Sequence, residues 1–481
     1  MSASDLGDLA PQDAIEFRSR LPGVAWPAVP DERGMTMLAL QYQFERTERW
    51  PPERLRRFQF QQLEILLRHA AAHVPHYKEV LARAGFGPEA ALTGEVWQRI
   101  PVLSRADVQR EGARLRAAAI PAFHGAVHEV VTSGSTGTPV RVLTTELSGM
   151  LFDAVALREA FWHRRNFAGV VAVVRAPRIP IPKGGKRAAN WNRAIGAALV
   201  GGPSVLFDCT RPAADLARSI ARLDPDYLLI YPSLLAEILR EAERQGLRFP
   251  ALAEVSTFGE HLSDEVRAAA RAELDVPVCD VYSAEEVGYI ALQCPDCTAY
   301  HVQSETVLVE VLDPEGRACA PGASGRVVVT PLHNFASPLL RYDIGDRAEL
   351  GGPCTCGRGL PVLTRILGRV RNMLVAPDGT RFWPRLNALF KASGLPIRQF
   401  QVIQRAPDRL ELRLATARPF VAAEEEGLRR ILRGLCRADY IVEISYHAAI
   451  PRGPSGKYED FVCEIAAPAG VSAIGVAEPR E

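Results

Sequence analysis

The chain has 481 residues, of which 47% are hydrophobic and 23% are charged, and both fractions are close to those of ordinary globular proteins. A chain of this length predicts more than one domain and excludes a single small binding module. Its 57 Lys and Arg residues against 56 Asp and Glu residues leave a formal net charge of +1. No overall field therefore attracts the chain to nucleic acid or to an anionic membrane, and we expect neither as a partner.

The amino-terminal residues and the cysteines bear on the compartment. Residues 1–17 do not predict a secretory signal, because they carry acidic residues and lack both a basic start and an apolar run. No stretch of 18 consecutive apolar residues predicts a membrane-spanning helix. We therefore expect a soluble, cytoplasmic protein. Its nine cysteines are then reduced, and their spacing points to metal binding rather than to disulfides.

In chain order, the pattern first predicts helices, because Leu63, Leu66 and Leu67 recur at helical spacing within residues 47–110. From residue 169 to residue 282, short runs rich in Val, Leu and Ile alternate with helical patterns, one of which stops at Gly246. This alternation predicts βα units around a mainly parallel sheet. Residues 305–350 then show strand and turn signals, which predict a smaller β-rich subdomain.

Past residue 369 the pattern changes to strand, helix and strand, at residues 408–416, 424–436 and 441–447. We therefore predict the α/β class and two domains. The large, multi-subdomain amino-terminal domain occupies residues 1–369 and combines doubly wound sheets with the small β-rich subdomain. A small α+β carboxy-terminal lobe occupies residues 370–481.

A polar glycine turn at residues 132–139 carries the first chemistry, between expected strands at 128–131 and 140–144. Its glycines let the backbone turn tightly, and its hydroxyls and N–H groups suit a phosphate chain. The spacing is neither that of a Walker A loop nor that of a GxSxG elbow, and a plain hairpin turn is the alternative. The candidate nucleotide-binding residues are Thr132, Ser133, Gly134, Ser135, Thr136 and Gly137.

Four further segments follow this turn along the chain. They are DVYSAEEVG at 280–288, PLLRYDIGD at 338–346, GR at 368–369 with ML at 373–374, and SGKY at 455–458. The five segments in this order resemble the motifs of adenylate-forming enzymes, the superfamily of acyl-CoA synthetases, luciferases and peptide-synthetase adenylation domains. They are most similar to the branch of phenylacetate-CoA ligases and capsular-polysaccharide proteins, and the resemblance covers residues 47–464.

The resemblance implies an AMP-forming acid–thiol ligase that uses ATP, Mg²⁺ and CoA. Such an enzyme joins a carboxylic acid, here expected to be an aryl or arylacetic acid, to the α-phosphate of ATP and then transfers the acyl group to CoA. Because two anions must meet, the site has to neutralise charge and orient the reactants. Two alternatives stay open. One is an adenylating ligase that passes the acyl group to an amine, a hydroxyl or a carrier-protein thiol, and the other is a catalytically weak, zinc-stabilised binding protein.

The resemblance also implies roles for single residues. Glu286 corresponds to the glutamate associated with Mg²⁺, an ion that prefers carboxylate oxygens. Asp346 corresponds to the aspartate that accepts hydrogen bonds from the two ribose hydroxyls, and Arg369 to a catalytic-site arginine near the ribose and phosphates. Lys457 corresponds to the catalytic lysine, which contacts the carboxylate and α-phosphate and leaves when the lobe rotates. The residues that would border the adenine are Tyr282, Gly259 and Glu260.

The sequence departs from the family pattern at two positions. Thr138 stands where many relatives carry lysine, and Arg141 is the basic residue that could compensate. Arg371, followed by Asn372, stands at the hinge, where the family usually has Asp or Lys. An acidic hinge is therefore excluded, and the adenylation half-reaction is better supported than the rotated second step.

Two close cysteine pairs, Cys294 with Cys297 and Cys354 with Cys356, suggest a metal site. Two thiolate pairs on separate turns can supply the four tetrahedral ligands of a structural Zn²⁺, and His301 could replace one of them. Reduced, unliganded cysteines are the alternative.

Two further features have an ordinary explanation beside a functional one. The basic loop at 182–187 could meet a CoA phosphate or an acidic substrate, but a solvated loop explains it equally. Phe161, Trp162 and Phe167 could wall an aryl pocket, although the apolar face of the helix that contains Trp162 favours a core position. A homodimer is compatible with the sequence, which does not identify the acid.

Overall fold

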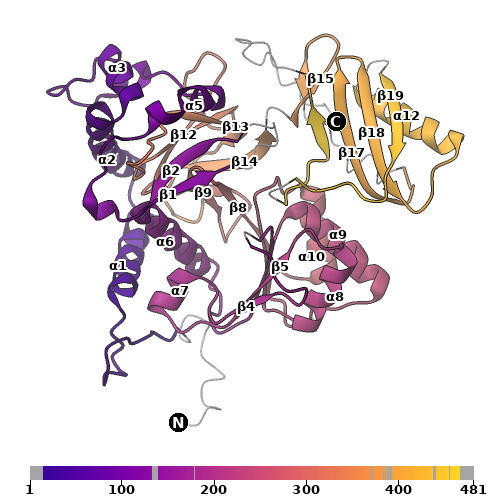
Figure 1. Ribbon diagram of the computed structural model, residues 1–481, viewed down its shortest axis with the longest axis horizontal. Helices are drawn as coiled ribbons and strands as arrows, with labels where there is room; N and C mark the ends of the chain where they lie inside the picture. The colour runs from indigo at the N-terminus through magenta and orange to yellow at the C-terminus, as the bar shows by residue number, and fades with distance from the viewer. Residues whose placement is uncertain are drawn as a thin grey trace.

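The computed structural model of the chain describes residues 15–132, 139–177, 179–369, 372–382, 393–436, 440–453 and 456–465, together with positions 384, 386 and 390. Figure 1 shows a large body of helices and sheet beside a smaller lobe that has its own sheet. In the part of the chain that the structure describes, we find no helix that is both long and apolar enough to cross a membrane.

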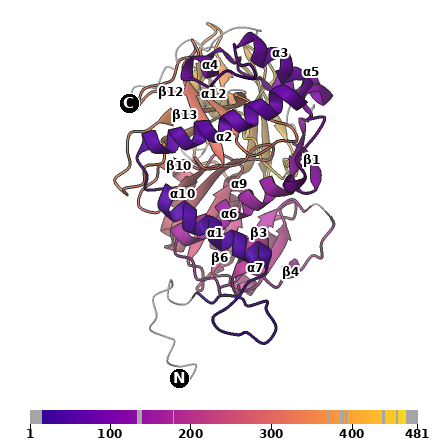
Figure 2. The ribbon, with the colours of Figure 1, turned by 90° about the vertical axis from the view of Figure 1, so that its left-hand side faces the viewer.

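Helices form most of the first hundred described residues, as the sequence predicted. Proline stands at the first helical position of two of them, where an N–H would have no partner within the helix. Ser104 and Asp107 cap another by a reciprocal capping box. The long second helix lies across one side of the large body (Figure 2). The bounds are α1 (Glu32–Thr47), α2 (Pro52–His73), α3 (Pro75–Arg83), α4 (Gly94–Arg99) and α5 (Arg105–Glu111).

Most strands of the large body belong to one sheet. Their bounds are β3 (Val171–Arg175), β4 (Lys186–Ala188), β5 (Ser204–Asp208), β6 (Tyr227–Ile230), β7 (Glu254–Phe258), β8 (Val278–Ala284), β9 (Gly288–Gln293), β10 (Tyr300–Val302), β11 (Val307–Leu312), β12 (Ser324–Pro331), β13 (Tyr342–Leu350) and β14 (Val362–Arg369). A separate hairpin, β1 (Val127–Val131) with β2 (Arg141–Thr145), flanks the glycine turn.

The order in this sheet of twelve strands is β11-β12-β13-β14-β10-β9-β8-β7-β6-β3-β5-β4. Neighbours from β8 to β5 are parallel, and those from β8 through β9 to β11 are antiparallel. The parallel sheet and the β-rich part that the sequence predicted are therefore two halves of one continuous sheet.

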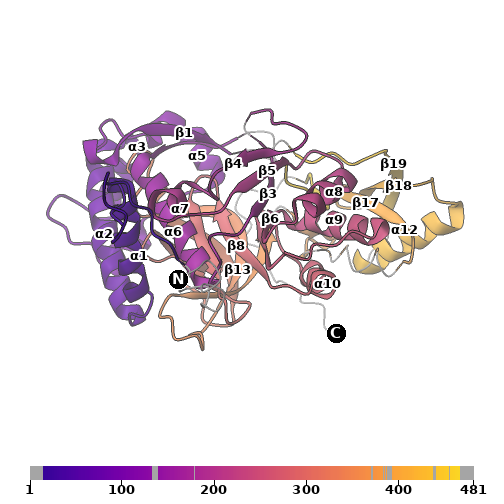
Figure 3. The ribbon, with the colours of Figure 1, turned by 90° about the horizontal axis from the view of Figure 1, so that it is seen from below.

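Helices cover both faces of the parallel half, as its buried apolar strands require. On one face, α8 (Ala213–Leu223), α9 (Pro232–Gln245) and α10 (Asp264–Leu274) share a core with β3, β5, β6 and β7. On the other, α6 (Glu146–Trp162) and α7 (Arg193–Ala198) pack with α1. Figure 3 shows these two groups on opposite sides of the strands. Gly246 ends α9 with a φ of +64°, as the sequence predicted.

The small lobe has its own hydrophobic core. Its main sheet has the order β19-β18-β17-β20. The bounds are β15 (Leu374–Val375), β16 (Arg381–Phe382), β17 (Ile397–Ala406), β18 (Arg409–Thr416), α12 (Ala422–Cys436), β19 (Ile441–Tyr446) and β20 (Phe461–Cys463). The predicted sequence of strand, helix and strand corresponds to β18, α12 and β19. The domain boundary at 369/370 stays a prediction.

Candidate active site

The carboxyl ends of four parallel strands meet a loop of the small lobe. Ala176, Cys209, Tyr231 and Gly259 follow β3, β5, β6 and β7. A Cβ on Gly456 of the lobe would stand 2.3 Å from the Cys209 sulfur, and Gly456 has a φ of +80°. Only glycine suits this close contact and this conformation. Because ligands of open α/β sheets bind at the carboxyl ends of the strands, the lobe closes over the expected binding edge.

Lys457 enters this edge directly after that glycine. Its Cε lies 3.2 Å from the place that a Cβ on Gly259 would occupy, so the side chain lies along the turn that follows β7. Burial lowers the pKa of Lys457 and Arg369 lowers it further. The carboxylates that oppose this are those of Glu285, Glu260 and Asp346. A bound anion would favour the charged ammonium here.

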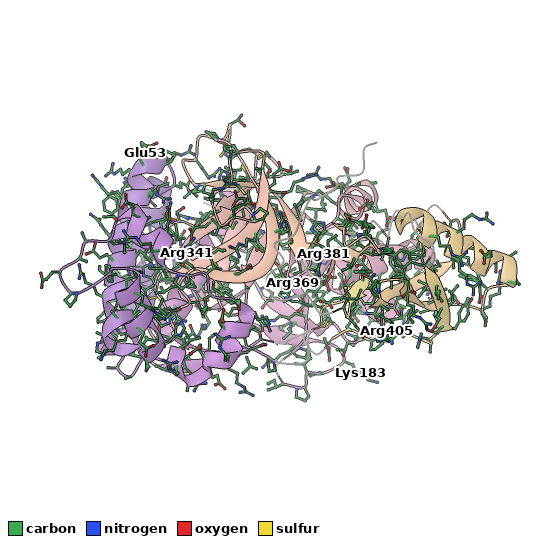
Figure 4. All side chains as sticks on the ribbon, turned by 90° about the horizontal axis from the view of Figure 1, so that it is seen from above. Glu53, Lys183, Arg341, Arg369, Arg381 and Arg405 are labelled. Carbon is green, nitrogen blue, oxygen red and sulfur yellow. The ribbon has the colours of Figure 1, made fainter. Side chains whose placement is uncertain are left out.

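Tyr282, Asp346 and Arg369 form a second group, contributed by β8, β13 and β14. Asp346 and Arg369 are paired across β13 and β14, with Arg369 Nε 3.4 Å from Asp346 Oδ1. The Tyr282 hydroxyl donates to Asp346 Oδ2 at 2.8 Å. Burial raises the pKa of Tyr282 and the Asp346 charge raises it further, so the hydroxyl keeps its proton. Asp346 is thus a fixed acceptor, and Figure 4 shows Arg369 where the large sheet meets the small lobe.

Glu286 is held beside the base of the glycine turn. Its carboxylate accepts a hydrogen bond from the Tyr342 hydroxyl at 3.2 Å, and Arg105 Nη1 lies 3.8 Å away. Arg105 also donates to the Thr132 hydroxyl at 3.1 Å, and that hydroxyl accepts the Val140 N–H. Sequence reasoning missed Arg105, because an arginine at the start of a short helix carries no signal that distinguishes it from a surface residue.

Some of the predicted site residues lie outside the residues that the structure describes. They are Ser133, Gly134, Ser135, Thr136 and Gly137 of the glycine turn, and the hinge residue Arg371.

Glu260, predicted to border the adenine, contacts the small lobe. One carboxylate oxygen accepts the N–H of Tyr458 at 2.6 Å and the other accepts the N–H of Ser233 at 2.9 Å. Both oxygens are therefore engaged in fixing the lobe against α9. Its predicted place beside the adenine stays a prediction.

The predicted metal ligands come together from both cysteine pairs. Cys294, His301, Cys354 and Cys356 each bring a ligand atom within 4.8 Å of the others. The Cys354 sulfur lies 4.0 Å from that of Cys294 and 3.7 Å from that of Cys297, and Cys356 Sγ lies 3.3 Å from His301 Nε2. Two sulfurs on one tetrahedral Zn²⁺, each bonded at about 2.3 Å, stand about 3.8 Å apart. The geometry therefore fits zinc, with five candidate ligands for four positions.

The structure bears unequally on the two remaining sequence features. The loop residues Lys183, Lys186 and Arg187 are exposed, and their contact with a CoA phosphate stays a prediction. Trp162 packs in the core beside α1, and its indole N–H donates to Glu48 at 2.8 Å. Trp162 and Phe167 therefore belong to the core, and Phe161 packs against it.

Residues 130–335 match the family model of AMP-binding enzymes. The chain is 27% identical over 395 residues to a phenylacetate-coenzyme A ligase of Thermus thermophilus, an alignment that covers 79% of this chain and 85% of the relative. It is 26% identical to the Escherichia coli enzyme of the same name over 67% of this chain and 73% of that one.

Among solved structures, a 2-hydroxyisobutyryl-CoA ligase in its postadenylation state has a TM-score of 0.68 to this chain. The alignment has 20% identity and covers 87% of this chain and 92% of the other. The same ligase in its thioesterification state has a TM-score of 0.57, over 87% and 91% of the two chains. The overall arrangement is thus more similar to the postadenylation form.

Proposed function

We propose that this chain, an adenylate-forming protein similar to the phenylacetate-CoA ligases, activates a carboxylic acid with ATP and transfers the acyl group to CoA. The first step joins the carboxylate to the α-phosphate and releases pyrophosphate. In the second, the CoA thiol attacks the acyl-adenylate, and AMP leaves. An aryl or arylacetic acid is the proposed substrate class, on the strength of the named relatives.

The observation that carries the proposal is the convergence of charged residues from distant segments at one sheet edge. Lys457, Asp346 and Arg369 come from the lobe and from two strands, yet all three lie within electrostatic reach of one another. Glu286 stands at the base of the glycine turn through Arg105 and Thr132. A protein that only bound a partner would have no need of this set.

Each residue then has a chemical task. The Lys457 ammonium neutralises charge between the acid and the α-phosphate, an interaction that strengthens as charge develops in the transition state. Asp346, held by Tyr282, accepts the ribose hydroxyls and fixes the nucleotide. Mg²⁺, which the carboxylate of Glu286 would help to hold, supplies charge neutralisation on the phosphates when it is bound. In the second step Lys457 leaves with the lobe, which turns at the proposed hinge residue Arg371.

A pyrophosphate-release screen tests the proposal. Purified protein with ATP and Mg²⁺ is offered aryl, arylacetic and short aliphatic acids, with and without CoA. We expect acid-dependent release for at least one aryl or arylacetic acid and an acyl-CoA product when CoA is present. Release that is captured only by hydroxylamine or an amine would reassign the acceptor. A complete absence of acid-dependent release would overturn the proposal.

We further propose that Cys294, Cys354 and Cys356, with Cys297 or His301, hold one structural Zn²⁺. Four protein ligands leave no open position for water or substrate, so the ion would stabilise the fold rather than take part in the reaction. Purified protein should contain about one zinc per chain, and Cys354→Ser should lower both zinc content and thermal stability because metal binding is coupled to folding. Metal-free protein of undiminished stability would leave reduced cysteines as the explanation.

A further inference from the structure

We propose that Arg452 is a positioning residue, which docks the small lobe onto Glu237 and Glu260 of the large body and so sets Lys457 in the active site. The inference deepens the proposed function and rests on it, because the positioned residue is the lysine assigned to adenylation. It gives Arg452 a part in acid activation and none in the later transfer to CoA.

The side chain of Arg452 crosses from the lobe to the large body. Arg452 belongs to the loop between β19 and β20, but its Nη2 lies 2.5 Å from the Glu237 carboxylate on α9. Its Nη1 donates to the Ser233 hydroxyl at 2.7 Å and lies 3.7 Å from Glu260. The arginine side chain is only 7% exposed. This is therefore a buried contact across the domain junction.

The same contacts hold the backbone on both sides of Lys457. Arg452 Nη1 donates to the Gly456 carbonyl at 3.3 Å, and the Tyr458 N–H donates to Glu260 at 2.6 Å. The two peptide groups that flank the lysine are thus tied to the Arg452–Glu260 pair. A reacting group needs its support fixed to within a fraction of an ångström, and these bonds fix the point from which Lys457 reaches the nucleotide.

The chemistry of the contact suits a lobe that must also leave. The groups around it are polar: Gln399 donates to Glu237 at 3.3 Å, and Arg240 donates to the carbonyl of Arg398 at 3.1 Å. When the lobe departs, the guanidinium and the carboxylates of this contact regain water. The core of the lobe is its own and stays intact.

Three variants and a matched control test the inference. Arg452→Ala removes the contact, and Arg452→Lys keeps the charge but loses the planar guanidinium with its two donor nitrogens. The double variant Arg452→Glu with Glu237→Arg exchanges the two charges. Arg433→Ala is the control, since this arginine contacts Tyr440 and Glu426 within the lobe. The readouts are acid-dependent pyrophosphate exchange, CoA capture of a supplied acyl-adenylate, and amide hydrogen exchange across residues 450–460.

For Arg452→Ala we expect pyrophosphate exchange to fall about 10- to 100-fold in kcat, with little change in the KM for ATP, a loss of the size that misplacement of a reacting group causes. The rate of CoA capture should change by less than about twofold, which is much smaller than the loss expected in pyrophosphate exchange. Arg452→Lys should be intermediate, the charge exchange should restore part of the loss, and Arg433→Ala should behave as the unaltered protein. Equal loss in both half-reactions, or no difference from Arg433→Ala, would overturn the inference.

Hydrogen exchange separates this inference from the proposed function. The Tyr458 amide should exchange about tenfold faster in Arg452→Ala than in the unaltered chain, because its acceptor is no longer held. Faster exchange in a protein that activates no acid would uphold the docking contact, while the assignment of Lys457 to adenylation would fall with the proposed function. Unchanged exchange in an active enzyme would overturn the docking contact alone.

Discussion

Two clusters in this molecule have the same composition, one arginine between two glutamates, but they join different parts. Arg165 donates to Glu159 at 2.7 Å and to Glu254 at 2.8 Å, all within the large body. Arg452 joins the lobe to the large body. The two arginine side chains are 9% and 7% exposed. Equal burial therefore does not distinguish the two clusters.

The carboxylates show the difference. Burial alone would raise the pKa of Glu254, but Arg165 and His163 outweigh burial and lower it to about 2. Burial raises the pKa of Glu260, and Arg452, 3.7 Å away, does not offset it. The inner cluster thus favours the Glu254 anion, whereas the junction leaves Glu260 less stable as an anion. In the proposed catalytic cycle the junction contact opens, and the weaker of the two clusters suits that role.

The largest expected difference between the two clusters is in how far removal of the arginine lowers the free energy of unfolding of the large body. Arg165→Met removes the guanidinium that two buried carboxylates share and should lower the free energy of unfolding of the large body by about 3–5 kcal/mol. Arg452→Met should lower it by less than about 1 kcal/mol, because Glu237 and Glu260 regain water when the lobe opens. Urea unfolding followed by a large-body tryptophan signal measures both. An equal loss for the two variants would contradict the comparison.

Lys457, the residue that the junction holds in place, should matter for the reaction rather than for stability. Lys457→Ala should reduce adenylation on the order of 10²- to 10³-fold, the usual effect of removing one group that stabilises transition-state charge, and should leave CoA capture of a supplied adenylate largely intact. Lys78→Ala, at an exposed lysine on α3, is the control. Equal losses in the two half-reactions would contradict the assignment, and an unchanged melting temperature excludes misfolding.

The inner cluster also predicts a pH dependence. Because the pKa of Glu254 is lowered in the folded chain from 4.5 to about 2, its contribution is fully present above pH 4.5 and is lost as the pH falls toward 2. The shift corresponds to about 3 kcal/mol. Glu254→Gln should therefore be less stable than the unaltered chain at pH 7, and the gap should narrow between pH 4.5 and 2. A gap that stays constant over this range would show that the charge of Glu254 is not what stabilises the fold.

The sequence predicted the parts of this molecule that repeat locally or follow a motif. Apolar runs alternating with helical patterns predicted the parallel strands and their helices. The motif order assigned Asp346, Arg369 and Lys457 to one site, and the structure brings these residues together, while their roles stay predictions. The sequence did not predict that the β-rich part continues the parallel sheet, because strand neighbours are chosen by packing. Nor did it reveal Arg452–Glu237, whose residues stand 215 positions apart.

A third cluster, Tyr282 with Asp346 and Arg369, differs from both others because it is expected to bind the nucleotide. Asp346 is held from two sides, at 2.8 Å by Tyr282 and at 3.4 Å by Arg369, yet a carboxylate has about four acceptor positions. Two can therefore still accept the ribose hydroxyls. The cluster should affect ligand binding more than stability.

Asp346→Ala should accordingly weaken ATP binding by about 1.5–3 kcal/mol, the range for a lost hydrogen-bond partner that is charged, while Tyr282→Phe, which removes only a support of that partner, should cost about 0.5–1.5 kcal/mol. Calorimetric titration with ATP and Mg²⁺ in the absence of acid measures both without turnover. The order of the two effects is the informative result, because a ribose ligand must matter more than the residue that holds it. A larger effect of Tyr282→Phe would move the nucleotide contact from Asp346 to the tyrosine, and an unchanged affinity in Asp346→Ala would remove this aspartate from the ribose.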